Sequence, residues 1–177
     1  YRYYAAPQDS RHFTPVDVQA SVAQAAMIGN PVSFPRVKRM ADAYTGIGGQ
    51  EAFQVMQVTE QAIMDSMLEA NRHGHIACTQ GGESLAGLKA AKAHGLISDA
   101  DYCVLDATAH ALKFMDFQNM YFNDAFPAAF GVTPDPSLVN RPELLLAPEE
   151  RDKMSEKEYI LESAARMARR LDLAVRS

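Results

Sequence analysis

The fold prediction starts from residues 75–106, which read HIACTQGGESLAGLKAAKAHGLISDADYCVLD. Two short apolar stretches, 75–78 and 102–106, flank a longer stretch from Ser84 to His94. The short stretches have the length and composition of buried strands. The longer one ends at His94-Gly95, a cation followed by a glycine, which is typical of a helix C-terminus. This order predicts a strand, a helix and a second strand.

The preceding residues repeat the alternation. Residues 52–58 (AFQVMQV) are β-prone and partly alternating, which predicts a strand, and Thr59 predicts the N-cap of a helix that ends at His73-Gly74. Four apolar residues form its expected buried stripe: Ile63, Met64, Met67 and Leu68. Strands and helices that alternate through short links indicate βαβ units, so the predicted fold class is α/β with a parallel sheet. Such sheets bind ligands beyond the carboxyl ends of their strands, here at 79–82 and 107–111.

Two more helices are expected nearer the start of the chain. Thr14-Pro15 predicts a helix start and Gly29-Asn30-Pro31 a stop, which gives a helix over 14–27. Ser33 predicts the cap of a second helix that closes at Thr45-Gly46. Its apolar face is expected from Val37, Met40, Ala41 and Tyr44.

The sequence changes character beyond Phe114, where aromatic residues and prolines become frequent. We therefore divide the chain into an α/β part, residues 1–114, and residues 115–177, an irregular helical tail expected to pack on the same lobe. Ser155 and Glu158 have the spacing of a capping box and predict a last helix. Its expected inward residues are Ile160, Leu161, Ala164, Ala165, Met167, Ala168 and Leu171, and its expected solvated residues are Arg166, Arg169 and Arg170.

The composition is that of an ordinary globular protein, with 47% apolar and 22% charged residues. A formal net charge of -5 argues against nucleic acid or an anionic membrane as the main partner. No apolar stretch reaches the roughly 18 residues of a membrane helix. Cys78 and Cys103 lie far apart, without metal-ligand spacing, so we expect buried thiols, no metal site and a cytoplasmic protein.

Two segments carry candidate site residues. In residues 78–84 (CTQGGES), two glycines before a helix suit an anion or a flat ligand, although a tight turn capped by Ser84 accounts for the same pattern. In residues 108–114 (TAHALKF), His110 suits a general base or a helix-start histidine bonded to the backbone. Lys113 suits a Schiff-base amine or a solvated lysine. The residues alone leave these alternatives open.

Four blocks, taken in order and with their spacing, resemble threonine synthases: residues 25–33 (AAMIGNPVS), 76–78 (IAC), 85–88 (LAGL) and 108–114 (TAHALKF). The resemblance covers about residues 14–114. It implies a parallel-sheet lobe of a fold type II enzyme, similar to the tryptophan synthase β-subunit, with pyridoxal 5'-phosphate (PLP) as cofactor. In this family the Schiff-base lysine and the phosphate-binding loop lie upstream of the matched blocks. The chain is therefore expected to be a C-terminal fragment, inactive alone and without a catalytic residue of its own.

The resemblance also implies cofactor-binding residues. Thr108 matches the hydroxyl that hydrogen-bonds the pyridine nitrogen of PLP, and Ala25 matches a small residue against the ring. Thr79, Gly81 and Gly82 are expected to line the cofactor cavity. This chain has Thr-Gln-Gly-Gly where several relatives have a Pro-His-Thr or Glu-Pro-Ala loop. That difference leaves the individual roles in the loop open.

The implied activity is that of a PLP-dependent carbon–oxygen lyase, which converts O-phospho-L-homoserine and water to L-threonine and phosphate. The expected partners are this small-molecule substrate and the N-terminal part of the same enzyme, and a homodimer is left open. Two alternatives also stay open: a threonine-synthase-like paralogue with another substrate, and a noncatalytic binding module that retains the fold.

Overall fold

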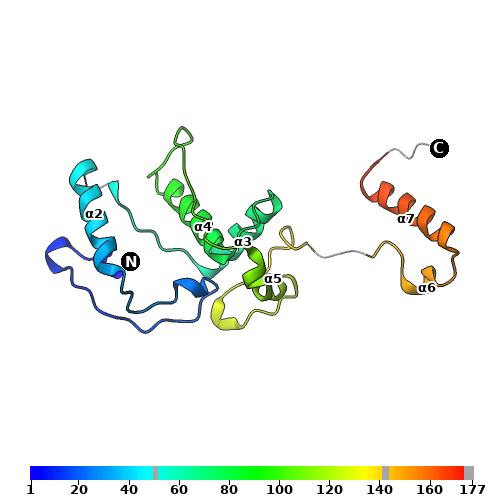
Figure 1. Ribbon diagram of the computed structural model, residues 1–177, viewed down its shortest axis with the longest axis horizontal. Helices are drawn as coiled ribbons and strands as arrows, with labels where there is room; N and C mark the ends of the chain where they lie inside the picture. Colours follow the sequence, from blue (N-terminus) through cyan, green and yellow to red (C-terminus); the bar gives the residue numbers. More distant parts are fainter. Residues whose placement is uncertain (50–51, 141–143, 174–177) are drawn as a thin grey trace. The chain divides into compact units, whose positions relative to one another are not determined.

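The chain divides into two compact units, Tyr1–Val139 and Asn140–Ser177. We use a computed structural model, which describes residues 1–49, 52–140 and 144–173 (Figure 1).

The centre of the first unit is the helix pair α3 (Glu60–Arg72) and α4 (Thr79–Ala93), which pack together (Figure 1). The Thr59 hydroxyl caps α3, because it accepts a hydrogen bond of 3.1 Å from the Ala62 N–H. The predicted helix and its buried stripe are confirmed, since all four expected residues are buried: Ile63, Met64, Met67 and Leu68.

Gly82 sets the close approach of these two helices. A Cβ atom at this position would lie 2.5 Å from the Ile63 carbonyl oxygen and 2.7 Å from the Met67 Cβ. Only a glycine fits such a gap, and the packing it allows offsets the low helix propensity of Gly81-Gly82. As a result, α4 begins at Thr79 rather than at the predicted Ser84.

A third helix, α5 (Met115–Phe122), follows the 3-10 helix η4 (Ala111–Phe114) and completes the core. The buried Tyr121 hydroxyl donates a hydrogen bond of 2.6 Å to Asp65 and accepts one of 2.8 Å from the Asp135 N–H. The segment after η5 (Ala128–Phe130) is thereby fixed to α3 and α5. The buried cluster consists of Val22, Ala23, Ile63, Met64, Met67, Leu68, Phe117 and Tyr121.

The region before α3 contains α1 (Arg2–Ala5), η1 (Gln8–Ser10), η2 (Gln24–Ala26) and α2 (Phe34–Gly48). The predicted helix over 14–27 is wrong, because within that range only the short 3-10 helix η2 forms. Long-range contacts determine the conformation of this segment. The Val22 N–H donates to a Glu60 carboxylate oxygen at 2.8 Å, whereas in a helix it would donate to a backbone carbonyl of the same segment. The helix α2 is confirmed, but of its expected apolar face only Ala41 is buried.

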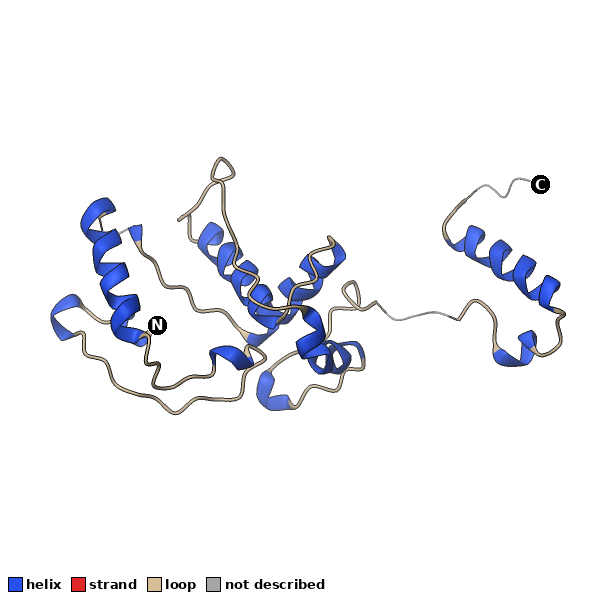
Figure 2. Ribbon diagram, viewed as in Figure 1, coloured by secondary structure: helices blue, strands red, loops and turns tan. Residues whose placement is uncertain are grey.

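The predicted α/β fold is also wrong: no strand and no parallel sheet form among the described residues, so the tryptophan-synthase-like lobe is not supported (Figure 2). Neither residues 52–58 nor residues 102–106 form a strand. In the part of the chain that the structure describes, the β-type pairing is one isolated antiparallel bridge, between Ala77 and His110. A strand needs a neighbouring strand for its backbone hydrogen bonds. Tyr102 is instead fully exposed, at 103% relative accessibility.

The second unit contains α6 (Pro148–Arg151) and α7 (Glu156–Arg170). The predicted capping box is confirmed: the Glu158 N–H donates to the Ser155 hydroxyl at 3.4 Å, and the Ser155 N–H donates to the Glu158 carboxylate at 2.9 Å. The predicted inward face of α7 is wrong, because the helix has no buried residue among those described. Its large apolar side chains are exposed: Ile160, Leu161, Met167 and Leu171.

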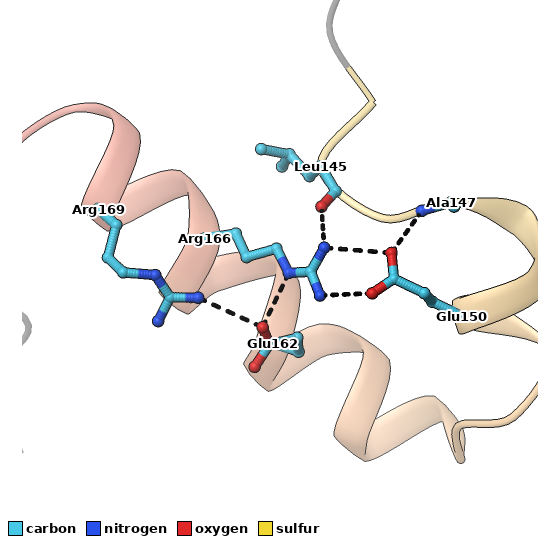
Figure 3. A network of polar contacts seen from close by, with 6 residues as sticks. All are labelled: Leu145, Ala147, Glu150, Glu162, Arg166 and Arg169. Atoms are coloured by element: carbon cyan, nitrogen blue, oxygen red, sulfur yellow. Dashed lines mark hydrogen bonds and ion pairs between the residues drawn. The ribbon is translucent and has the colours of Figure 1, made fainter.

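Polar contacts of Arg166 connect α6 to α7 (Figure 3). Its guanidinium donates to Glu150 at 2.7 Å, to Glu162 at 2.8 Å and to the Leu145 carbonyl at 2.8 Å. These hydrogen bonds hold the pKa values of both carboxyl groups below the ordinary glutamate value. Arg166, expected in solvent, is therefore a half-buried structural residue.

None of the helices in the described ranges has the length and apolar character that a membrane crossing requires.

Candidate functional site

The first turn of α4 carries the predicted residues Thr79, Gly81 and Gly82, and all three are buried. They belong to the helix, and not to a loop between a strand and a helix as predicted. Gly82 faces α3, where it serves helix packing. The remaining residue of the turn, Gln80, is 91% buried, since its relative accessibility is 9%.

This turn contains buried polar atoms without hydrogen-bond partners. They are the Thr79 hydroxyl oxygen and both polar atoms of the Gln80 amide. Side chains at the start of a helix tilt towards its N-terminus, where the first backbone N–H groups also have no partner within the helix. An unpaired buried polar group costs about 1–3 kcal/mol, and folded proteins keep few of them. Such a cluster is therefore a candidate place for hydrogen bonds from a ligand, an ordered water or another polypeptide segment.

The segment that carries Thr108 is held against the same turn. The Ser84 hydroxyl lies 2.9 Å from the Asp106 carbonyl oxygen, within hydrogen-bond distance. A Cβ atom on Gly81 would lie 3.6 Å from the Ala107 Cβ, which is ordinary contact distance. Thr108 itself is exposed. The structure thus places the residues just before Thr108 against α4.

The segment that carries Ala25 approaches α4 as well. Ala25 is an exposed residue of η2, which lies against α4. The preceding residues are anchored on α3: the Glu60 carboxylate accepts hydrogen bonds from the Val22 N–H at 2.8 Å and from the Ser21 hydroxyl at 3.2 Å. The fold therefore brings all three predicted segments to one helix.

The electrostatics of this region are acidic. Glu83 is half-buried, and its pKa is raised mainly by that burial and further by the Glu60 carboxylate. Two carboxyl groups that interact repel an additional anion. The region consequently suits the neutral polar edge of a ligand better than a phosphate group.

His110 and Lys113 occupy supporting positions. The His110 Nδ1 accepts a hydrogen bond of 3.2 Å from the Leu112 N–H and so caps η4. The backbone of the same residue forms the antiparallel bridge to Ala77. Of the two interpretations of His110, the structure supports the backbone-bonded helix-start histidine. Lys113 is exposed.

Gln80 is the residue that the sequence analysis missed. Its signal in the sequence was the polar pair Thr79-Gln80, which directly follows an apolar run that ends at Cys78. In the structure Cys78 is completely buried. Polar side chains next to a buried strand-like segment require partners. That rule, together with the burial of Gln80, makes it a further candidate site residue.

The chain is similar to a threonine synthase. Over 102 residues, 58% of the chain, it is 32% identical to Threonine synthase 2, chloroplastic, from Arabidopsis thaliana. The chain spans only 18% of the length of that relative. No family model matches it. The match supports a relationship to threonine synthases, while the cytoplasmic location stays a prediction, because the relative is named as chloroplastic.

Proposed function

We propose that the chain is part of a PLP-dependent threonine synthase, a carbon–oxygen lyase that converts O-phospho-L-homoserine and water to L-threonine and phosphate. The observation that carries the proposal is the similarity over 102 residues to a threonine synthase. The geometry adds support, because the segments of Ala25 and Thr108 both contact α4, whose first turn carries unpaired polar atoms of Thr79 and Gln80.

The residues around the first turn of α4 fit the ring edge of PLP and do not fit its phosphate. The Thr79 and Thr108 hydroxyls and the Gln80 amide offer hydrogen bonds to ring substituents and to the ring nitrogen. Ala107, beside Gly81, is small enough for a flat ring to approach. The carboxyl groups of Glu60 and Glu83 disfavour a phosphate at the same place. We therefore assign phosphate binding to the remainder of the enzyme.

Bound PLP withdraws electrons from the amino-acid Cα and so makes loss of its proton easier. In this proposal the Thr108 hydroxyl would hydrogen-bond the ring nitrogen. A neutral hydroxyl does not hold a proton there as a carboxylate would, which suits elimination and replacement better than transamination. Thr79 and Gln80 would supply hydrogen bonds to the cofactor, and the small Ala25 side chain would leave room for it.

The remainder of the same enzyme is the proposed partner of this chain. It would supply the Schiff-base lysine that moves protons at Cα and Cβ, as well as the phosphate-binding loop. A homodimer remains a prediction of the family resemblance.

The proposal is tested on the full-length gene product with PLP and O-phospho-L-homoserine, by measuring phosphate release and the PLP absorbance spectrum. Thr108→Ala should lower turnover roughly tenfold, since it removes one hydrogen bond to the cofactor. Thr108→Ser keeps the hydroxyl and should retain most of the activity. Thr14→Ala, an exposed threonine elsewhere in the chain, is the matched control.

Unchanged turnover and an unchanged spectrum in Thr108→Ala would remove Thr108 from the site. Turnover of a different phosphorylated or sulfur-containing amino acid, with none of O-phospho-L-homoserine, would support the paralogue. A full-length protein that binds no PLP would favour the noncatalytic module.

A further inference from the structure

The first unit contains a second candidate site, a cavity of about 760 Å³ lined by residues of α1, α2 and the segment 53–55. Its volume lies within the range of about 300–1,000 Å³ that is typical of small-molecule pockets. No residue of the proposed cofactor site lines it. The cavity therefore needs an explanation of its own.

Aromatic and apolar groups are part of the cavity lining. The rings of Tyr4 and Phe53 contact each other with their centroids 5.0 Å apart, and Val55 also lines the cavity. Aromatic walls of this kind offer a flat, apolar ligand a large contact area. They favour a ligand with a ring or another planar apolar group.

Cationic groups from two different segments also line the cavity. The Arg11 guanidinium donates to the carbonyl oxygens of Ala6 at 3.0 Å and of Tyr4 at 3.2 Å, so its position is fixed by backbone. In the described part of the chain no carboxylate pairs with Arg11. Lys38 forms an ion pair of 2.5 Å with Asp42, which is also in the lining. Two cations against one carboxylate leave the cavity wall with a net positive charge.

The Tyr4 hydroxyl adds an unsatisfied donor. It is buried and has no hydrogen-bond partner. Burial, and then the nearby Asp42 carboxylate, raise the pKa of this phenol, so the group keeps its proton at neutral pH. A protonated phenol without a partner is suited to donate to an oxyanion.

We propose that this cavity binds a small organic anion in which a phosphate or carboxylate group adjoins a flat apolar group. Arg11, Lys38 and the Tyr4 hydroxyl bind the oxyanion, and the Phe53 ring contacts the apolar group. Guanidinium groups bind both oxyanions through paired N–H donors. The proposal does not depend on the threonine synthase assignment.

Phenyl phosphate is the probe, titrated into the full chain by isothermal titration calorimetry. It should bind, and Tyr4→Phe should weaken the binding roughly threefold to tenfold, the effect of one hydrogen bond. Tyr3→Phe is the matched control, because Tyr3 packs against Tyr4 and Phe34 but does not line the cavity. Its affinity should equal that of the unmodified chain.

Asp42→Asn provides a second test, because the proposal predicts a higher affinity for phenyl phosphate. Misfolding would lower the affinity instead. The substitution removes the opposing carboxylate and releases Lys38, so phenyl phosphate should bind roughly threefold more tightly.

Inorganic phosphate should bind more weakly than phenyl phosphate, and the cation benzamidine should not bind. The proposal is overturned if phenyl phosphate does not bind at millimolar concentration. Equal affinities of Tyr4→Phe, Asp42→Asn and the unmodified chain would also overturn it.

Discussion

The helices α3 and α7 are both amphipathic, yet they differ in what covers their apolar faces. Met64 of α3 is fully buried, whereas Met167 of α7 is 49% exposed. The face of α3 meets α4, which Gly82 brings close, and α5. The helix α7 is connected to α6 through the polar contacts of Arg166 (Figure 3). Apolar residues at helical spacing therefore predict a helix and its apolar face. Burial of that face also requires a complementary surface.

The largest expected difference between the two helices is in the free energy of unfolding that is lost when a methionine is replaced by alanine. Met64→Ala should lower the free energy of unfolding by about 3 kcal/mol, because it leaves a cavity in a closed core. Met167→Ala should change it by less than about 0.5 kcal/mol, as is usual for an exposed residue. Urea unfolding followed by circular dichroism measures both, and equal costs would contradict the comparison.

Two glycines of α4, Gly82 and Gly87, allow a test of whether close packing of α4 explains the burial of α3. Gly82→Ala introduces a Cβ atom 2.5 Å from the Ile63 carbonyl oxygen and should cost about 2 kcal/mol of stability. Gly87→Ala is the matched control in the same helix, because a Cβ there has no atom within 4 Å. It should stabilise the protein by about 0.5–1 kcal/mol through helix propensity. If Gly82→Ala is also stabilising, close packing does not fix the start of α4.

The smallest effect is a pH dependence of opposite sign at Glu83 in the first unit and at two glutamates in the second unit. In the second unit, Arg166 lowers the pKa of Glu150 and the Ser155 hydroxyl lowers that of Glu158. Their stabilisation is present above the ordinary value of 4.5 and is lost as the pH falls through the lowered values. The raised pKa of Glu83 has the opposite sign, since protonation there favours the folded state.

Amide resonances of α7 in the full chain should therefore lose their helical chemical shifts on acidification before those of α3. Loss of the α3 shifts first would contradict this order. Glu149→Gln, which alters an exposed carboxylate of α6, is the control and should leave the order unchanged.

The helices α3 and α7 were predictable from the sequence because their signals are local, whereas the predicted helix over 14–27 does not form. The Thr59 cap and the stripe from Ile63 to Leu68 predict α3, and the Ser155–Glu158 capping box predicts α7. The predicted sheet, by contrast, does not form among the described residues. Residues 102–106 have the composition of a strand, but pairing depends on a neighbouring segment that local sequence does not reveal.

The segments of Ala25 and Thr108 both lie against α4, the helix that begins at Thr79. The roles of these residues toward a cofactor stay predictions of the family resemblance. The helical conformation of Thr79 to Gly82 was not foreseen, because it follows from the contact of Gly82 with α3. Gln80 gained its importance only from burial without a hydrogen-bond partner.

The most direct test of the proposed function is the product balance of the full-length gene product with PLP and O-phospho-L-homoserine. The account predicts phosphate and L-threonine in equal amounts, with both lowered together in Thr108→Ala. Release of neither product by a PLP-loaded protein, or equal activity of Thr108→Ala and the unmodified protein, would contradict it.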